Sequence, residues 1–499
     1  MKIREERGYL FLVRRYSLNV CELFLQSFVT DHSAKDCRQD GAYQRNAYPR
    51  ARFAFEDSWQ AQLLFALKYE GVNVEVLRAL FPCLPAGEVR DFVAAHPLGS
   101  AQKRVWFLYE YLTGRRLDLP DGEGGAYLPL IDERVQYALP VSDGVRERRY
   151  HVVNNMIGNR AFAPYVRRTD RMRAFGSAKL REECNQLLAQ YSPDLLYRAI
   201  QYLYIKETKS SFAIERETPN QRRADAFVAI LRGMVDSPLA KEQLVAVQNA
   251  VVDVRYRQSD WRRDQVYVGQ TITPGFEKVH FIAPRPDAID ELMDGYLDCL
   301  AQWMKSSDSD PVVIAAVMSF AFVFLHPFGD GNGRVYRYLM HAILAQRGFV
   351  PRGLIFPISA VILKDPLSYD KALETFSARV MPRLDYSIDA EGEISVANDS
   401  RDYYRAIDYT PIVEYFQEVM AKTIRTEWKS ELDYLKRYDR MRRAMQQVVD
   451  MPEKNVNQFV LFVQQNGGRL SRRKRDYFAE LSDEEVRRLE KIVKSGFED

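Results

Sequence analysis

The stretch that decides the fold of this chain reads His326-Pro327-Phe328-Gly329-Asp330-Gly331-Asn332-Gly333-Arg334-Val335-Tyr336-Arg337. Its residue types are those needed around a nucleoside triphosphate. His326 can accept a proton near neutral pH, and Asp330 can bind a hard cation such as Mg²⁺ through oxygen. Arg334 and Arg337 are three positions apart, so on a helix they share a face from which both guanidinium groups can bind phosphate.

The segments on either side of this stretch have the patterns of helices. Residues 311–325 are nearly all apolar but too few to cross a bilayer, so they predict a buried helix. Pro327 disfavours helical geometry at His326, and the helix should therefore end there. Residues 335–347 carry apolar side chains at helical spacing before Gly348, which predicts a second helix.

The second helix places the glycine-rich loop at its N-terminus. The backbone N–H groups of Gly331, Asn332 and Gly333 then form a site for an anion, and glycine leaves room for phosphate oxygens. The competing interpretation is a structural loop, which we disfavour because seven or more chemically specific positions coincide. The G-x-x-x-x-G-K-[ST] motif does not occur, and no strand is predicted before the glycines as a dinucleotide-binding fold requires.

Over these residues the chain resembles the Fic family, whose motif is H-P-F-x-[DE]-G-N-[GK]-R-x-x-R. The match is complete from His326 to Arg337. Fic enzymes usually transfer AMP from ATP to a protein hydroxyl. The resemblance implies that His326 is the base and that Asp330 binds Mg²⁺ between the α- and β-phosphates. It also implies that the ATP phosphates are bound by Gly331, Asn332, Gly333, Arg334 and Arg337.

A second segment, residues 209–217, resembles the inhibitory helix of this family, [ST]-x-x-x-E-[GN]. Ser211 and Glu215 match this pattern, whereas Arg216 stands where Gly or Asn is usual. The resemblance implies that Glu215 pairs with Arg337 and keeps it from the γ-phosphate, because a carboxylate and a phosphate compete for the same guanidinium. The competing interpretation is an ordinary solvated helix face.

A β-hairpin is predicted before the motif. Residues 265–269 and 278–282 both alternate, and Thr273-Pro274-Gly275 lies between them. The resemblance implies a flap at residues 265–282, to which a segment of the target protein can pair by strand addition. A hairpin that only covers the core is the alternative. Fic proteins also often place an aromatic residue against the adenine; Tyr369 is the candidate, with a core tyrosine as the alternative.

Composition limits the remaining possibilities. A length of 499 residues suffices for two or three domains, and a net charge of +3 is too small to indicate nucleic acid or an anionic membrane as a partner. The five cysteines form no C-x-x-C pair and predict reduced thiols. The charged start resembles no secretory signal and no apolar run reaches membrane-spanning length, so a cytoplasmic protein is expected.

These patterns predict a mainly α-helical fold, a Fic-type helical bundle with a β-hairpin flap. We expect an N-terminal helical region over residues 1–175 and a C-terminal helical region over residues 384–499. The expected Fic core lies between them, at residues 176–383, with an inhibitory helix at about 192–217.

The function predicted from the sequence is that of a protein adenylyltransferase. It would use ATP and Mg²⁺ to modify a Ser, Thr or Tyr hydroxyl of a protein docked on the flap, and Glu215 would restrain it. Three alternatives stay open. The same site could transfer another phosphate-containing group, or remove AMP with Glu215 orienting water. The chain could be a DNA-binding regulator that acts through basic residues 469–475 and has a vestigial Fic core, or a scaffold whose N-terminal region binds a partner. A homo-oligomer is compatible with each.

Overall fold

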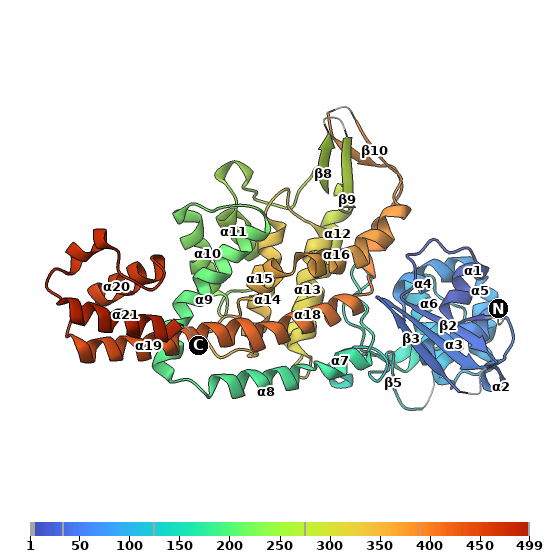
Figure 1. Ribbon diagram of the computed structural model, residues 1–499. Coiled ribbons are helices and arrows are strands. Elements are labelled where there is room, and N and C mark those ends of the chain that lie inside the picture. Colours follow the sequence, from blue (N-terminus) through green and yellow to red (C-terminus); the bar gives the residue numbers. More distant parts are fainter. Residues whose placement is uncertain (1–4, 32–33, 123–124, 274–275, 390, 498–499) are drawn as a thin grey trace.

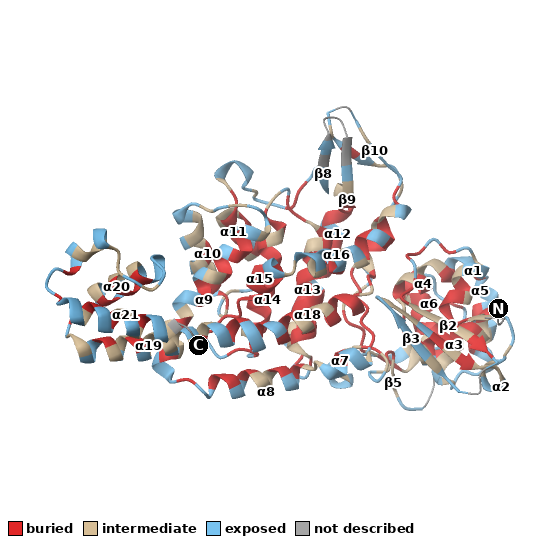
Figure 2. Cartoon of the chain, viewed as in Figure 1, coloured by how far each residue is buried: buried red, intermediate tan, exposed pale blue. Residues whose placement is uncertain are grey.

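The computed structural model describes residues 5–31, 34–122, 125–273, 276–389 and 391–497. The predicted mainly α-helical fold is confirmed, and the N- and C-terminal parts lie at opposite ends of a central group of helices (Figure 1). Buried apolar side chains of the described residues form separate clusters in each of these three parts (Figure 2). No helix in the described ranges has both the length and the apolar character needed to cross a bilayer.

The N-terminal part contains the expected helices and also sheets that the sequence analysis did not anticipate. Its helices are α1 (Tyr9–Arg15), α2 (Arg50–Phe53), α3 (Trp59–Tyr69), α4 (Val74–Leu80), α5 (Ala86–Ala95) and α6 (Ser100–Thr113). A four-stranded sheet has the order β1 (Glu5–Arg7), β2 (Leu25–Thr30), β4 (Tyr43–Pro49) and β3 (Asp36–Asp40), with β2 and β4 parallel. A three-stranded sheet has the order β5 (Leu128–Pro129), β7 (Val152–Asn154) and β6 (Val145–Glu147).

The sheet was missed because its strands lack the alternation of apolar and polar residues that reveals a strand. Strand β3 is the clearest case, since it has the sequence DCRQD and is exposed along nearly its whole length. Its pairing with β4 is therefore decided by tertiary contacts.

The central part is built around α13, which is buried on almost every side. The helices of this part are α7 (Asp170–Ala174), α8 (Ser177–Leu188), α9 (Pro193–Ile214), α10 (Gln221–Gly233), α11 (Lys241–Val251), α12 (Pro286–Lys305), α13 (Pro311–Leu325), α14 (Asn332–Gln346), α15 (Ile358–Lys364), α16 (Pro366–Val380), α17 (Arg401–Arg405) and α18 (Thr410–Lys422). Helix α13 contacts α12, α14 and α18 and is red in Figure 2. Its N-cap is Asp310, whose side chain accepts hydrogen bonds from the backbone of Val312 and Val313 at 2.9 and 3.2 Å.

Helix α9 brings the predicted inhibitory segment to the central helices. It begins after Ser192, whose hydroxyl accepts from the backbone N–H of Leu195. A buried carboxylate, Glu207, fixes its course: it lies 2.8 Å from His341 Nε2 of α14 and accepts from the backbone N–H of Ser359 in α15 at 3.0 Å. A buried carboxylate must be bonded in this way to be tolerated, so these contacts hold α9 against both helices.

The predicted flap hairpin is present, and a second, smaller hairpin follows α16. Strands β8 (Tyr267–Thr273) and β9 (Phe276–Ile282) pair antiparallel to form the flap, and β10 (Tyr386–Ile388) pairs with β11 (Ile394–Val396). Pro274 and Gly275, which we placed in the flap turn, lie outside the described residues.

The C-terminal helices have their own cluster of buried side chains, between Met441 and Val493. They are α19 (Lys429–Val448), α20 (Glu453–Gln465) and α21 (Asp483–Phe497), and a π-helical segment, Thr423–Trp428, joins α18 to α19. The side chains of α18 belong to the central cluster. The domain boundaries at 175 and 383 remain predictions.

Candidate active site

Helix α13 ends at His326, which adopts the left-handed conformation with φ 49° and ψ 57°. Its Nδ1 lies 3.1 Å from the carbonyl oxygen of Val323. Because a carbonyl can only accept, Nδ1 carries the hydrogen, and Nε2 of the neutral ring is left with a free lone pair. Removal from water lowers the pKa of His326 to about 4, helped by the charge of Arg262 and opposed by that of Glu215. The imidazole is therefore neutral at pH 7 and can accept a proton.

The loop after His326 is closed by contacts between residues close in sequence. Asn332 accepts from the backbone N–H of Phe328 at 3.0 Å and donates to its carbonyl oxygen at 2.7 Å. The Phe328 ring is buried, with its centroid 5.2 Å from that of Trp261. Gly331 has φ 90° just before the first residue of α14, a conformation that glycine adopts without strain.

The N-terminus of α14 faces Glu215. A Cβ atom on Gly333 would lie 2.0 Å from Glu215 Oε1, so the carboxylate packs directly on the Gly333 backbone. The first N–H groups of a helix lack intrahelical acceptors and carry partial positive charge. The structure therefore brings a carboxylate to the position at which the sequence predicts phosphate.

The same carboxylate contacts the second arginine of the motif. Arg337 Nη2 lies 2.6 Å from Glu215 Oε1, and Arg337 Nε donates to the hydroxyl of Ser211 at 2.7 Å. Arg337 is fully buried. Burial disfavours the charge of Glu215, but the charge and hydrogen bond of Arg337 outweigh it and hold the pKa of Glu215 below its usual value.

The backbone conformation at Arg216 shows why the family pattern has Gly or Asn at this position. Arg216 has φ 57°, and its N–H donates to the carbonyl of Ala213 while that of Glu217 donates to Phe212, both at 3.0 Å. This is a Schellman C-cap, in which the left-handed position favours Gly or Asn. Arginine is present in spite of that preference, at a cost of about 1–2 kcal/mol.

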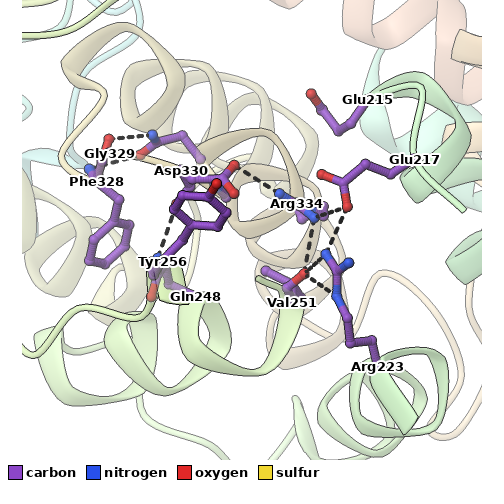
Figure 3. A network of polar contacts seen from close by, with 12 residues as sticks. Glu215, Glu217, Arg223, Gln248, Val251, Tyr256, Phe328, Gly329, Asp330 and Arg334 are labelled. Atoms are coloured by element: carbon purple, nitrogen blue, oxygen red, sulfur yellow. Dashed lines mark hydrogen bonds and ion pairs between the residues drawn. The ribbon is translucent and has the colours of Figure 1, made fainter. Parts of the chain in front are cut away.

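Glu217, which was not among the predicted site residues, forms an ion pair with Arg334, the first arginine of the motif (Figure 3). Its Oε2 lies 2.9 Å from Arg334 Nη1 and 2.7 Å from Arg223 Nη2. Both arginines also donate to the carbonyl oxygen of Val251, and Arg334 Nη2 lies 3.0 Å from Asp330 Oδ1. The acidic residues in the segment 207–217 were a signal that could have pointed to Glu217. Nothing in the sequence indicates that its partner is Arg334.

The carboxylate of Asp330, the predicted metal ligand, is partly open to solvent. Its Oδ1 accepts from the backbone N–H of Gly331 at 2.6 Å and pairs with Arg334, while 43% of the side chain stays exposed. Within the described ranges, no group of three or more potential metal ligands occurs. Mg²⁺ typically binds through one or two carboxylates together with substrate phosphates. A single accessible carboxylate beside a helix N-terminus fits that requirement.

Tyr369, the candidate for adenine contact, lies near the paired residues Glu215 and Arg337. Its ring is nearly parallel to that of Tyr336, at 7°, with centroids 6.3 Å apart. Tyr369 is half-buried. Burial raises the pKa of its hydroxyl well above the usual value.

Comparison with known proteins supports the family resemblance over this part of the chain. Residues 238–344 match the model of the Fic/DOC family. Proteins named Protein adenylyltransferase Fic are similar: that of Nematostella vectensis is 38% identical over 73 residues, 14% of this chain and 16% of the relative. That of Drosophila melanogaster is 37% identical over 95 residues, 18% of this chain and 16% of the relative. The matches thus span about a sixth of those relatives.

Among solved structures, this chain matches a Fic family protein from Desulfovibrio desulfuricans G20, with a TM-score of 0.38 and 22% identity over 53% of this chain and 76% of that one. Another is Fic-1 (residues 134–508) from C. elegans, with a TM-score of 0.33 and 17% identity over 52% of this chain and 73% of that one.

Proposed function

We propose that this protein, whose residues 238–344 match the model of the Fic/DOC family, transfers AMP from ATP to a Ser, Thr or Tyr hydroxyl of another protein. One observation carries the proposal: a neutral imidazole with a free Nε2 lies at the end of α13, one loop before a helix N-terminus with two motif arginines. The relatives named as adenylyltransferases add support.

The reaction follows from what each group can do. His326 Nε2 takes the proton from the acceptor hydroxyl as its oxygen attacks the α-phosphorus. The bond from that phosphorus to the bridging oxygen breaks, and pyrophosphate leaves. The N–H groups at the start of α14, with Arg334 and Arg337, hold the phosphates in line for this attack. Bound through Asp330, Mg²⁺ would supply charge neutralisation at the phosphates.

We propose that the described conformation is a restrained one. Glu215 occupies Arg337 and lies against Gly333, so the γ-phosphate could bind there only if the carboxylate moved. A fully buried guanidinium forms strong charge-assisted hydrogen bonds, which makes the competition effective.

The flap is the proposed docking place for the target protein. Strands β8 and β9 form a two-stranded sheet among the described residues, so its outer edges can pair with an extended segment. Val268 and Ile272 of β8 are 44% and 51% exposed, which offers apolar contact to the added strand. We also propose that Tyr369 contacts the adenine and that the protein works in the cytoplasm.

Labelling tests the proposal. A Glu215→Gly variant is incubated with Mg²⁺ and each of the four labelled nucleoside triphosphates, and modified residues are identified by mass spectrometry. We expect AMP on hydroxyl side chains, and none in a Glu215→Gly, His326→Ala control. A different added group would redefine the substrate. No labelling with any nucleotide, or loss of AMP from a premodified protein, would overturn the proposed transfer.

A further inference from the structure

Arg262 contacts the backbone of the catalytic loop from the segment before the flap. The side chain is 2% exposed. Its Nε donates to the carbonyl oxygen of His326 at 2.8 Å, and its backbone N–H donates to that of Pro327 at 2.8 Å. Arg262 therefore holds the two residues at which α13 turns into the loop.

The same guanidinium also contacts both ends of the flap. Arg262 Nη1 donates to the carbonyl oxygen of Asp264, just before β8, and Nη2 to that of Pro284, just after β9, both at 2.6 Å. One planar group thus connects the residue that carries the imidazole to the two places where the flap leaves the core. Its fixed fork suits carbonyls that lie in different directions.

The cost of burying the Arg262 charge indicates that this residue serves to fix the positions of the carbonyl groups and not only to fill space. No ion pair found among the described residues involves Arg262, so the buried charge is compensated at hydrogen-bond distance by carbonyl dipoles, with a longer-range contribution from the charge of Asp264. Burying a charge without an opposite one is costly. Burial lowers the pKa of Arg262 to about 10, which leaves it charged at pH 7. An apolar side chain could fill the same space but could not fix the carbonyls.

We propose that Arg262 is a positioning residue that fixes His326 relative to the flap, so that the imidazole and a hydroxyl presented on the flap meet in one geometry. The inference rests on the proposed AMP transfer. A displacement of about 1 Å between reacting groups can lower a rate by about 10². Arg262 does not touch the nucleotide sites of α14, so its loss should slow transfer without weakening ATP binding.

In the experiment, Arg262→Lys is introduced into the Glu215→Gly variant, which serves as the parent. The rates of self-modification of the two proteins are compared at saturating ATP and Mg²⁺. Calorimetry gives the affinity and the number of ATP sites for each protein, and rates are expressed per ATP site so that unfolded molecules do not count. We expect a rate lower by roughly ten- to a hundred-fold with unchanged ATP affinity, because lysine keeps the charge but not the fork. Arg262→Gln, which can keep one carbonyl bond, should behave alike.

Arg347 provides a matched control. Among the described residues it too donates to carbonyls, those of Met304, Ser307 and Ser309 at 2.9–3.1 Å, but at the far end of α14. Arg347→Lys should leave the rate per ATP site unchanged. A rate per ATP site in Arg262→Lys equal to that of the parent would overturn the proposal, as would a matching loss in Arg347→Lys or failure of both Arg262 variants to fold. A parent that labels nothing would instead refute the proposed function.

Discussion

The motif loop, residues 326–337, and the end of α9, residues 211–217, meet at the same place but are fixed differently. The loop is closed by bonds between neighbours, such as those of Asn332 to Phe328, and is also held by the long-range contact of Arg262 with His326. The end of α9 depends on two long-range ion pairs, made by Glu215 and Glu217. Each region includes one non-glycine residue at positive φ, His326 in the loop and Arg216 after α9. We propose that the end of α9 acts as a removable brake on the site, and variants can test the two regions one at a time.

The largest effect should come from His326→Ala in the loop. Loss of a general base typically lowers the rate by about 10²–10⁴. ATP affinity measured by calorimetry should stay unchanged, because the imidazole does not contact the phosphates in the proposed mechanism. Labelling by this variant at the rate of its Glu215→Gly parent would remove the imidazole from the chemistry.

Asp330→Ala, also in the loop, should weaken ATP binding in the presence of Mg²⁺ by about 10²-fold, since a metal contributes several kcal/mol of charge stabilisation. The matched control is calorimetry with EDTA, in which the variant and its Glu215→Gly parent should bind ATP alike. Equal Mg²⁺-dependent affinity for the two proteins would place the metal on other residues.

On the α9 side, Glu215→Gln should raise self-modification by roughly ten- to a hundred-fold, because hydrogen bonds to charged groups are worth about 1.5–3 kcal/mol. Glutamine keeps the side chain while losing the charge, whereas glycine at this C-cap position removes the side chain and also adds backbone freedom. Arg337→Ala breaks the same pair and should not activate, since the phosphate contact is lost with it. Parent-level self-modification in both Glu215 variants would show that α9 is not the brake.

Glu217→Gln should activate less than Glu215→Gln, by at most about five-fold. The side chain of Glu217 is 34% exposed, as is that of Glu215, but Glu217 shares its carboxylate between Arg334 and Arg223. Its loss therefore frees Arg334 only in part and changes the free energy by about 1 kcal/mol. Arg334 would also keep its contacts with Asp330 and Val251. Activation equal to that of Glu215→Gln, measured by the same self-modification assay, would show that the two carboxylates contribute equally to the inhibition.

The smallest effect is expected from Arg216→Gly. Glycine removes the strain at φ 57°, and this stabilises the paired conformation. Because glycine also has greater backbone freedom when the segment is released, the net stabilisation of the paired conformation is about 0.5–1 kcal/mol. Basal self-modification should fall about two- to five-fold. The same substitution beside Glu215→Gln should have no effect, and a fall there would mean that residue 216 acts on the site directly.

The sequence by itself determined the helix–loop–helix around residues 326–337, the start of α9 at Ser192 and the hairpin of the flap. Each rests on interactions within a few residues, such as a cap, a proline that ends a helix, or glycine in a loop. Such short-range preferences are readable because the interacting residues are neighbours in the chain. The motif residues were found for the same reason.

Apart from the pair of Glu215 with Arg337, which the family resemblance implied, only the tertiary structure decided which partners these residues have. Glu217 meets Arg334 across 117 positions and Arg262 meets His326 across 64, and no local pattern links residues so far apart. The N-terminal sheet was likewise unreadable, because exposed polar strands such as β3 carry no periodic apolar signal. Contacts between residues so far apart in the chain form only when the core packs. The sequence alone therefore indicates which residues carry the chemistry of the site, whereas the fold determines how they are aligned and how the site is restrained.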